Sequence, residues 1–173
     1  MLDIHVLLVK TTRRDWQSKM AETVLLASSK AGYPVDVHFL QGIPGHIGQG
    51  RAAGYSIGRH PYVTYVDDDD YLMPDALSVL GHYFDGCANA VCSGELTDQN
   101  GVLQRGRDRH HLICYRRDIA NAFSHKDWSV CGDMVLANSL GDGVIDVRHC
   151  GYVHRLYESE GRKLRRAHKD EYM

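Results

Sequence analysis

The chain has 173 residues, 43% of them hydrophobic and 24% charged, which is an ordinary composition for a globular protein with one hydrophobic core. Its formal net charge of −2 gives no general reason to expect binding to nucleic acid or to a membrane surface. No apolar run reaches the roughly 18 residues that a membrane-spanning helix needs, and the N-terminal segment is too short and too strand-like for a signal peptide. The five cysteines are odd in number and form no Cys-x-x-Cys pair. We therefore expect a reduced, cytoplasmic protein without an integral membrane segment.

The first half of the chain alternates between strand and helix patterns. These patterns predict, in order, a strand at 4–9, a helix at about 15–30 with Asp15 as its N-cap, a strand at 35–40, a glycine-rich loop at 41–50, a short helix at about 51–58 and a strand at 62–66. Such alternation predicts a parallel sheet with crossover helices. Right-handed crossovers then place the loops after the first and third strands at the same edge of the sheet.

The second half of the chain shows shorter and less regular patterns. They predict a helix at about 75–84, strands at 90–96 and 112–115 with a turn at 98–101 between them, a helix at 127–140, a strand at 144–147 and an extended segment at 152–157. A basic cluster follows near the C-terminus, made of Arg162, Lys163, Arg165, Arg166 and Lys169. This cluster is either a solvated helix face or a contact surface for phosphates or nucleic acid.

Four consecutive aspartates, Asp67 to Asp70, follow the third predicted strand directly. Open α/β sheets bind their ligands at the carboxyl edge of the strands, which is where this run begins. Carboxylates this close repel one another unless a cation compensates, and Mg²⁺ is commonly shared between carboxylates and substrate phosphates. The run therefore predicts a metal–phosphate site, with a solvated acidic loop as the alternative.

Three segments stand at linked spacings around these aspartates. They are Gly50-Arg51-Ala52-Ala53-Gly54, Tyr65-Val66-Asp67-Asp68-Asp69-Asp70 and Pro74-Asp75-Ala76-Leu77. Together they resemble the GT-A fold of nucleotide-sugar glycosyltransferases, especially the large inverting glycosyltransferase family 2. The resemblance implies an α/β fold, a single-domain Rossmann-like GT-A sandwich with a mostly parallel central sheet and helices on both faces. It also implies one catalytic domain over 1–173, with a nucleotide-binding half at about 1–80, an acceptor and catalytic-base half at about 81–160 and a basic tail at 161–173.

The same resemblance implies a nucleotide-sugar donor held with Mn²⁺ or Mg²⁺. Asp67 would contact the nucleotide ribose or the metal, and Asp69 would bind the metal that bridges the diphosphate. Asp68 fills the variable position of the motif and is interpreted as a spacer, whereas Asp70 would support the site. Arg51 would face the diphosphate or a carboxylate, and its alternative role is that of a surface helix residue.

The residues that would recognise the nucleotide base of the donor match the family less well. Thr11 and Thr12 stand at the end of the first strand, where the resemblance implies contacts with the nucleotide. The second strand lacks the acidic-Gly-Ser segment that is usual in the family, and Asp36 would serve there only in a different register. The identity of the nucleotide base is therefore open.

Two later residues complete the implied site. Asp133 stands in the position of the catalytic base, with a helix N-cap as its alternative role and Asp127 as the local alternative base. His154 is the better candidate for a metal-binding histidine and His149 the second, against an ordinary surface or core role for either. The pair His110-His111 has no motif behind it.

These assignments predict a metal-dependent inverting glycosyltransferase. A glycan or lipid-linked glycan is the favoured acceptor, and a nucleic acid is the less favoured one. Because the chain is short, the acceptor is either small or held by a partner, a second subunit in an oligomer, or the basic tail. The alternatives are a metal-dependent nucleotidyltransferase or phosphohydrolase, and a non-catalytic nucleotide-binding module.

Overall fold

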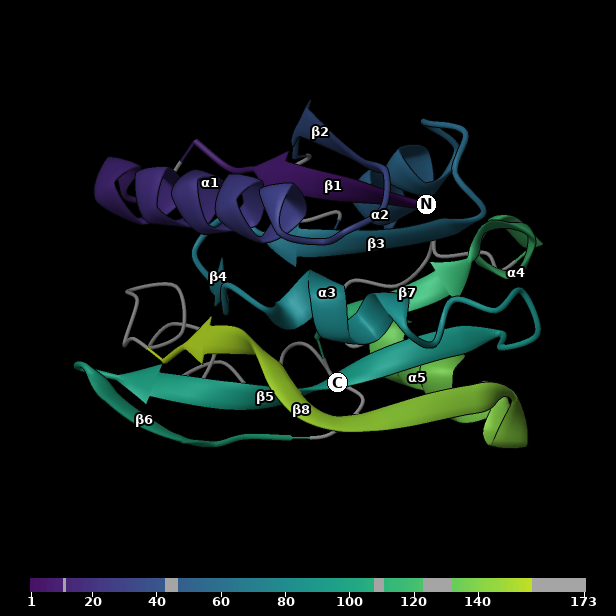
Figure 1. Cartoon of the computed structure of the whole chain (residues 1–173). Helices are drawn as coiled ribbons and strands as arrows, with labels where there is room; N and C mark the ends of the chain where they lie inside the picture. Colours follow the sequence, from purple (N-terminus) through teal and green to yellow (C-terminus); the bar gives the residue numbers. More distant parts are fainter. Residues whose placement is uncertain (11, 43–46, 108–110, 123–131, 157–173) are drawn as a thin grey trace, which may run out of the picture.

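The computed structural model describes residues 1–10, 12–42, 47–107, 111–122 and 132–156, which form one eight-stranded sheet with helices on both faces (Figure 1). The strands are β1 (Leu2–Leu8), β2 (Val35–Gln41), β3 (Tyr62–Asp67), β4 (Tyr71–Leu72), β5 (Ala90–Gln99), β6 (Val102–Arg105), β7 (Ile113–Arg116) and β8 (Val144–Arg155). The helices are α1 (Arg14–Ser29), α2 (Ile47–Tyr55), α3 (Ala76–Gly81), α4 (Arg117–Ala122) and α5 (Gly132–Ser139), with a 3-10 turn at Gly141–Gly143. The strand order is β2-β1-β3-β7-β5-β8-β4, and β6 pairs with β5 outside this path.

The first three strands form the parallel unit that the sequence pattern predicts. β1 lies between β2 and β3 and is parallel to both, so that Leu8 aligns with Gln41 and Leu7 aligns with Asp67. Because the three strands end together, the loop after β1 and the aspartates after β3 share one edge of the sheet. β5 and β8 add a long parallel pair, so that most of the paired residues in the sheet are parallel, while β4, β6 and β7 contribute short antiparallel pairs.

Several predicted boundaries were wrong for local reasons. Arg13 is the N-cap residue of α1, and its own side chain makes no capping hydrogen bond. Asp15 lies in the first turn of α1 and pairs with Arg13 at 2.7 Å, so it does not act as the predicted cap. The predicted strand at 144–147 and residues 152–155 of the predicted extended segment at 152–157 belong to one long strand, β8, whose middle is polar and therefore lacks a strand pattern. Residue 157 lies outside the described residues.

The turn at residues 98–101 connects β5 to β6 and not, as predicted, to the strand at 112–115. Asn100 and Gly101 have φ angles of 55° and 84°, which is the left-handed pair that a two-residue hairpin turn requires. All four residues of β6 are exposed, so this strand carries no burial pattern that the sequence could reveal. The short helix α4 was also absent from the predicted elements.

Two hydrophobic clusters cover the two faces of the sheet. On one face, α1 contributes Met20 and Val24 and α3 contributes Leu77 and Leu80, all of them buried in one cluster with apolar residues of the sheet. On the other face, side chains from α2, α4 and α5 pack on β3, β5 and β7. Figure 1 shows α1 and α3 in front of the sheet and α5 behind it. Each fully buried large apolar side chain contributes roughly 1.5–3 kcal/mol relative to an exposed one, so these two layers hold the sheet in place.

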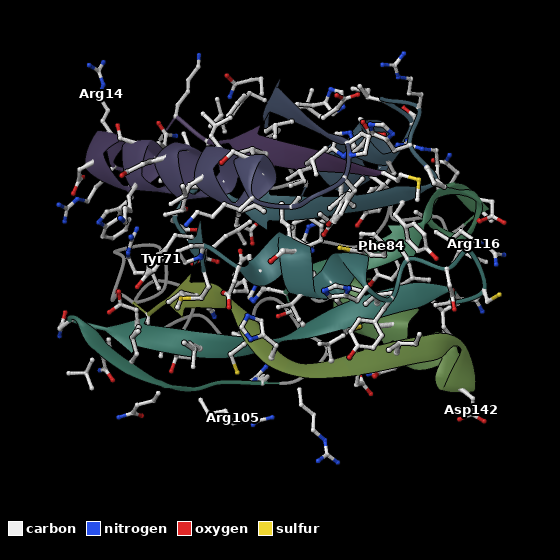
Figure 2. All side chains as sticks on the ribbon, viewed as in Figure 1. Arg14, Tyr71, Phe84, Arg105, Arg116 and Asp142 are labelled. Atoms are coloured by element: carbon white, nitrogen blue, oxygen red, sulfur yellow. The ribbon has the colours of Figure 1, made fainter. Side chains whose placement is uncertain are left out.

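Aromatic rings extend the front cluster at the end of α3. Phe84, labelled in Figure 2, stacks on the ring of Tyr62 with centroids 4.4 Å apart and meets Tyr33 edge-on at 5.6 Å. Tyr33 also donates a hydrogen bond of 2.8 Å to the carbonyl oxygen of Leu77. These contacts tie α3, and with it the segment after the aspartates, to the centre of the sheet.

A buried ionic network holds the opposite, amino edge of the sheet. The Asp3 carboxylate is fully buried and accepts hydrogen bonds from His38 Nε2 at 2.7 Å, from the backbone N–H groups of Arg59 and His60 at 3.0 and 2.7 Å, and from Arg117. Burial by itself raises the pKa of Asp3, but these hydrogen bonds and the Arg117 charge lower it below the ordinary value. With a guanidinium in direct contact, this carboxylate is a structural anchor and a poor ligand for a metal cation.

Two further features concern the cysteines and the length of the helices. The cysteines among them, Cys87, Cys92, Cys114 and Cys150, are free thiols. Within the part of the chain that the structure describes, no helix is long and apolar enough to cross a membrane.

Candidate active site

The four aspartates alternate in exposure along the chain. Asp67 and Asp69 are partly exposed, whereas Asp68 and Asp70 are buried, with 4% and 1% of their surface accessible. This alternation divides the run into two carboxylates that are partly open to solvent and two that are buried against the rest of the protein. The solvated acidic loop considered from the sequence is therefore wrong for Asp68 and Asp70.

Asp68 connects the aspartate run to the loop after β1. Its Oδ2 accepts hydrogen bonds from the backbone N–H of Val9 at 2.6 Å and from Gln17 Nε2 at 2.7 Å, and its Oδ1 accepts one from Thr12 Oγ1 at 2.9 Å. The interpretation of Asp68 as a spacer was wrong, since this side chain fixes one loop of the site against the other. Thr12 is thus placed in the site through Asp68. Thr11 lies outside the described residues.

Asp70 is held by the end of β8. Tyr152 donates from its hydroxyl to Asp70 Oδ2 at 2.8 Å, and the backbone N–H of Arg155 donates to Asp70 Oδ1 at 2.7 Å. Burial, together with the neighbouring charges of Asp69 and Asp67, raises the pKa of Asp70 well above its ordinary value. Clustered carboxylates with this electrostatic environment are the kind of site that a divalent cation stabilises.

Arg155, on the same strand, also contacts the aspartate run. Its Nη1 donates to the backbone carbonyl of Asp69 at 2.7 Å, and its guanidinium lies over the rings of Trp16 and Tyr71 at 4.9 and 5.3 Å. Figure 2 shows Tyr71 at the left of the molecule, on the short strand β4 below α1. β4 pairs with β8, so the chain that leaves the aspartates runs directly along the strand that carries Arg155.

Arg51 lies in the site and not on an exposed helix surface. Only 7% of this residue is accessible, and its guanidinium stacks on the ring of Tyr65 at 3.7 Å from the centroid. Its Nη2 is 3.5 Å from Asp67 Oδ2. The surface alternative for Arg51 was therefore wrong, and the side chain carries a positive charge to the partly exposed end of the aspartate run.

Two histidines and a buried glutamate face the aspartates from β5, β8 and the segment before β7. Asp70, His111 and His154 each offer a potential metal-binding atom, and these atoms all lie within 4.8 Å of one another. His154 was expected near the metal from the sequence, whereas His111 had no motif behind it. Glu95, only 2% exposed, contacts both histidines.

His149, the second candidate from the sequence, lies elsewhere. Its Nε2 is 3.2 Å from Asp75 Oδ1, at the start of α3 on the outside of the sheet. His149 lies between Val147 and Cys150, where the pairing of β8 with β5 is irregular.

Asp133 falls in the first turn of α5. Its side chain lies outside the described part of the structure, and so does the alternative base Asp127. The helix itself is seated by Leu136 and Ala137, which are buried against the rear face of the sheet. The basic cluster at 162–169 is likewise outside the described residues.

Residues that the sequence did not assign to the site have one property in common. Each reaches it through long-range strand pairing, as with Glu95, His111, Tyr152 and Arg155. The sequence hint for His111 is its place directly before the apolar run Leu112–Cys114, which marks it as a residue at a strand end.

Comparison with solved structures identifies the fold. No model of a protein family matches the chain, and no curated protein sequence matches it. The structure of S. aureus TarS 1–349 in complex with UDP-GlcNAc matches 92% of this chain with a TM-score of 0.68 at 11% identity, and this chain spans 59% of that one. A glycosyltransferase involved in glycosylation of the major capsid of PBCV-1 matches over 99% of this chain and 98% of its own, with a TM-score of 0.56 at 12% identity.

A third similar structure contains a metal. Rv0371C from Mycobacterium tuberculosis H37Rv, in complex with manganese, covers 95% of this chain and 96% of its own, with a TM-score of 0.57 at 14% identity. The similar structures include GT-A-like glycosyltransferases and related nucleotidyltransferases. The chain therefore has the GT-A-like, Rossmann-like nucleotide-binding fold that the sequence resemblance implied, and that prediction is confirmed.

Proposed function

We propose that this protein is a metal-dependent inverting glycosyltransferase that uses a nucleotide-sugar donor. The observation that carries the proposal is the position of Asp67 and Asp69, partly exposed at the carboxyl edge of β3, beside the buried cation of Arg51. The likeness of the fold to TarS in complex with UDP-GlcNAc supports the same class of donor.

The described side chains fit a nucleoside diphosphate with a divalent ion such as Mn²⁺ or Mg²⁺. Asp67, Asp69 and His154 supply the oxygen and nitrogen atoms that such ions bind. The ion, when bound, neutralises the charge that develops on the diphosphate leaving group. Arg51 would add a fixed positive charge from its place on the Tyr65 ring. Thr12, in the loop that Asp68 binds, would contact the nucleoside end.

Transfer with inversion requires one general base. In the proposed step an acceptor hydroxyl attacks the anomeric carbon from the face opposite the diphosphate, Asp133 takes the hydroxyl proton, and the sugar–phosphate bond breaks to release the nucleoside diphosphate. General-base catalysis of this kind contributes on the order of 10²–10⁴ in rate. Asp127 is the alternative base.

For the acceptor we favour a glycan or a lipid-linked glycan. One similar structure of comparable length belongs to a glycosyltransferase involved in glycosylation of the major capsid of PBCV-1, which supports a transferase of this fold and size. A nucleic-acid acceptor bound by the basic tail is the less favoured proposal, and salt-dependent retention on DNA would support it.

The experiment is a turnover assay with a panel of nucleotide-sugars in the presence of Mn²⁺, using release of the nucleoside diphosphate as the readout. Asp69→Ala and Asp133→Asn should each lose turnover, while Asp118→Asn, a change at an exposed carboxylate paired with Arg116, should not. Wild-type turnover in both Asp69→Ala and Asp133→Asn would overturn the mechanism.

A nucleotidyltransferase is the second candidate, because related nucleotidyltransferases stand among the similar structures, which include IspDF from Campylobacter jejuni at a TM-score of 0.53. The same assay separates the two functions. Turnover of nucleoside triphosphates with inert nucleotide-sugars would favour nucleotidyl transfer. Calorimetric binding of nucleotide with no turnover of either class would indicate a non-catalytic binding module.

A further inference from the structure

Glu95 is a buried carboxylate that lies between two imidazoles. Its Oε2 accepts a hydrogen bond from His111 Nδ1, and its Oε1 lies 3.6 Å from His154 Nδ1. The contact with Glu95 uses the Nδ1 atom of His111, so the second ring nitrogen, Nε2, lies on the other side of the ring. That Nε2 atom faces the aspartate run, 3.8 Å from Asp67 Oδ2.

The two imidazoles are also held by ring contacts. His111 stacks on the ring of Tyr152 with centroids 4.7 Å apart and an interplanar angle of 9°, and His154 meets His111 edge-on at 4.7 Å. Tyr152 in turn binds Asp70 at 2.8 Å. The same residues therefore position two ring nitrogens and one carboxylate on a common centre.

This arrangement has the features of a metal site with its supporting shell. Metal-binding histidines usually donate their second ring N–H to a carboxylate, which fixes the tautomer and raises the basicity of the ligand nitrogen. Two imidazoles with one carboxylate, leaving other positions open, form a ligand set that suits first-row transition ions. Mg²⁺, by contrast, prefers oxygen ligands in octahedral geometry and gives up its water reluctantly.

We propose that Asp70, His111 and His154, oriented by Glu95, bind a first-row transition ion such as Mn²⁺ in preference to Mg²⁺. The inference rests on the metal-binding part of the proposed function and goes beyond it. For the protein without nucleotide it assigns the metal to two histidines and to the last aspartate of the run, where the proposed function names Asp67, Asp69 and His154. Glu95 acts as a positioning residue through both histidines.

In this proposal Asp70 has a different role from Asp67 and Asp69. Asp70 is buried beside the imidazoles, so it can hold an ion in the absence of nucleotide. Asp67 and Asp69 are partly exposed and are available to the donor side. Metal binding by the free protein should therefore depend on Asp70 more than on Asp69.

The test is electron paramagnetic resonance with Mn²⁺ alone, on the full chain without nucleotide. Mn²⁺ should bind, a hundredfold excess of Mg²⁺ should leave most of it bound, and Zn²⁺ should displace it, because zinc stands above manganese in affinity for nitrogen ligands. Electron spin echo envelope modulation of the bound Mn²⁺ should show nitrogen coupling from two imidazoles. His111→Ala should remove one coupling and weaken Mn²⁺ binding at least tenfold.

Two further variants separate positioning from coordination. Glu95→Gln should weaken Mn²⁺ binding by about tenfold to hundredfold while both nitrogen couplings remain, since the neutral amide would leave the imidazoles in place but reduce their basicity. His149→Ala is the matched control on β8, and it should leave affinity and coupling unchanged because His149 pairs with Asp75.

The outcomes distinguish this inference from the proposed function. Displacement of Mn²⁺ by equimolar Mg²⁺, or bound Mn²⁺ without nitrogen coupling in the wild-type protein, overturns the inference even where turnover is metal-dependent. A two-nitrogen Mn²⁺ site without nucleotide-sugar turnover overturns the proposed function and leaves the inference standing. The wild-type spectrum decides the matter if the His111 or Glu95 variants fail to fold.

Discussion

Thr12 donates a hydrogen bond of 2.9 Å to Asp68 across 56 positions of sequence, which joins the loop after β1 to the aspartates after β3. The loop that would meet the nucleoside and the run that would meet its diphosphate are therefore held in a fixed relation. The other hydrogen bonds to Asp68, from Val9 and Gln17, stabilise the same loop. Asp68, which stands between the candidate ligands Asp67 and Asp69, thus has a structural role of its own.

Asp68→Ala should raise the KM for the nucleotide-sugar more than it lowers kcat. The substitution leaves the Val9 N–H and the Thr12 hydroxyl, both partly buried, without their carboxylate. A fully buried unsatisfied donor costs about 1–3 kcal/mol, and access of water reduces that cost here. Steady-state kinetics and urea unfolding measure the two effects, with the exposed Asp142→Asn as the control. An unchanged KM in Asp68→Ala would falsify the positioning role.

Arg51→Lys should weaken binding of the nucleoside diphosphate by roughly tenfold, even though the charge is kept. A lysine has no planar fork and cannot stack on Tyr65 as the guanidinium does at 3.7 Å, an interaction of about 0.5–2 kcal/mol. Isothermal titration calorimetry gives the affinity directly. Arg59→Lys, at a side chain that is 86% exposed, is the matched control, and equal losses in the two variants would contradict a specific role for Arg51.

Asp133→Asn should lower kcat by about 10²–10⁴ while nucleotide and metal binding remain as in the wild type. The amide cannot take a proton but closely matches the carboxylate in size, so the donor side of the site is spared. Single-turnover kinetics together with calorimetry separate the two effects. If Asp127→Asn shows the loss and Asp133→Asn does not, the base is Asp127.

His5 makes the stability of the fold depend on pH. Burial, with a smaller contribution from the His38 ring stacked on it at 5.0 Å, lowers the pKa of His5 from 6.5 to about 4. Between these values the unfolded chain binds a proton at this position that the folded chain does not, so the free energy of unfolding falls as the pH is lowered. Above about pH 6.5 both states are neutral here and the effect is absent.

Urea unfolding at about pH 7 and about pH 5 measures this slope. His5→Gln removes the titrating group, and its stability should change less between the two pH values than that of the wild type. His82→Gln, at the exposed C-cap of α3, should keep the wild-type slope. The comparison rests on the difference between pH values, so a lower overall stability of His5→Gln does not affect it.

The sequence by itself determined the parallel half of the sheet and the place of the aspartates. Alternating strand and helix patterns up to Asp67 are local, and a right-handed crossover leaves one arrangement for them. Together with Arg51 and the proline after the run, this was enough to imply the GT-A fold that comparison with solved structures confirmed. The short antiparallel strand β6 was not predicted, because all of its side chains are exposed and do not alternate between buried and exposed positions.

Only the tertiary structure decided how the site is supported. The pairing of β5 with both β7 and β8 brings Glu95, His111 and His154 together, and no spacing along the chain encodes that pairing. It also decided which of two histidines on β8 lies near the aspartates, since His154 contacts Glu95 and His111 whereas His149 pairs with Asp75. Asp68 and Asp70 acquired their roles in the same way, from partners that are distant in sequence and become neighbours only when the strands align.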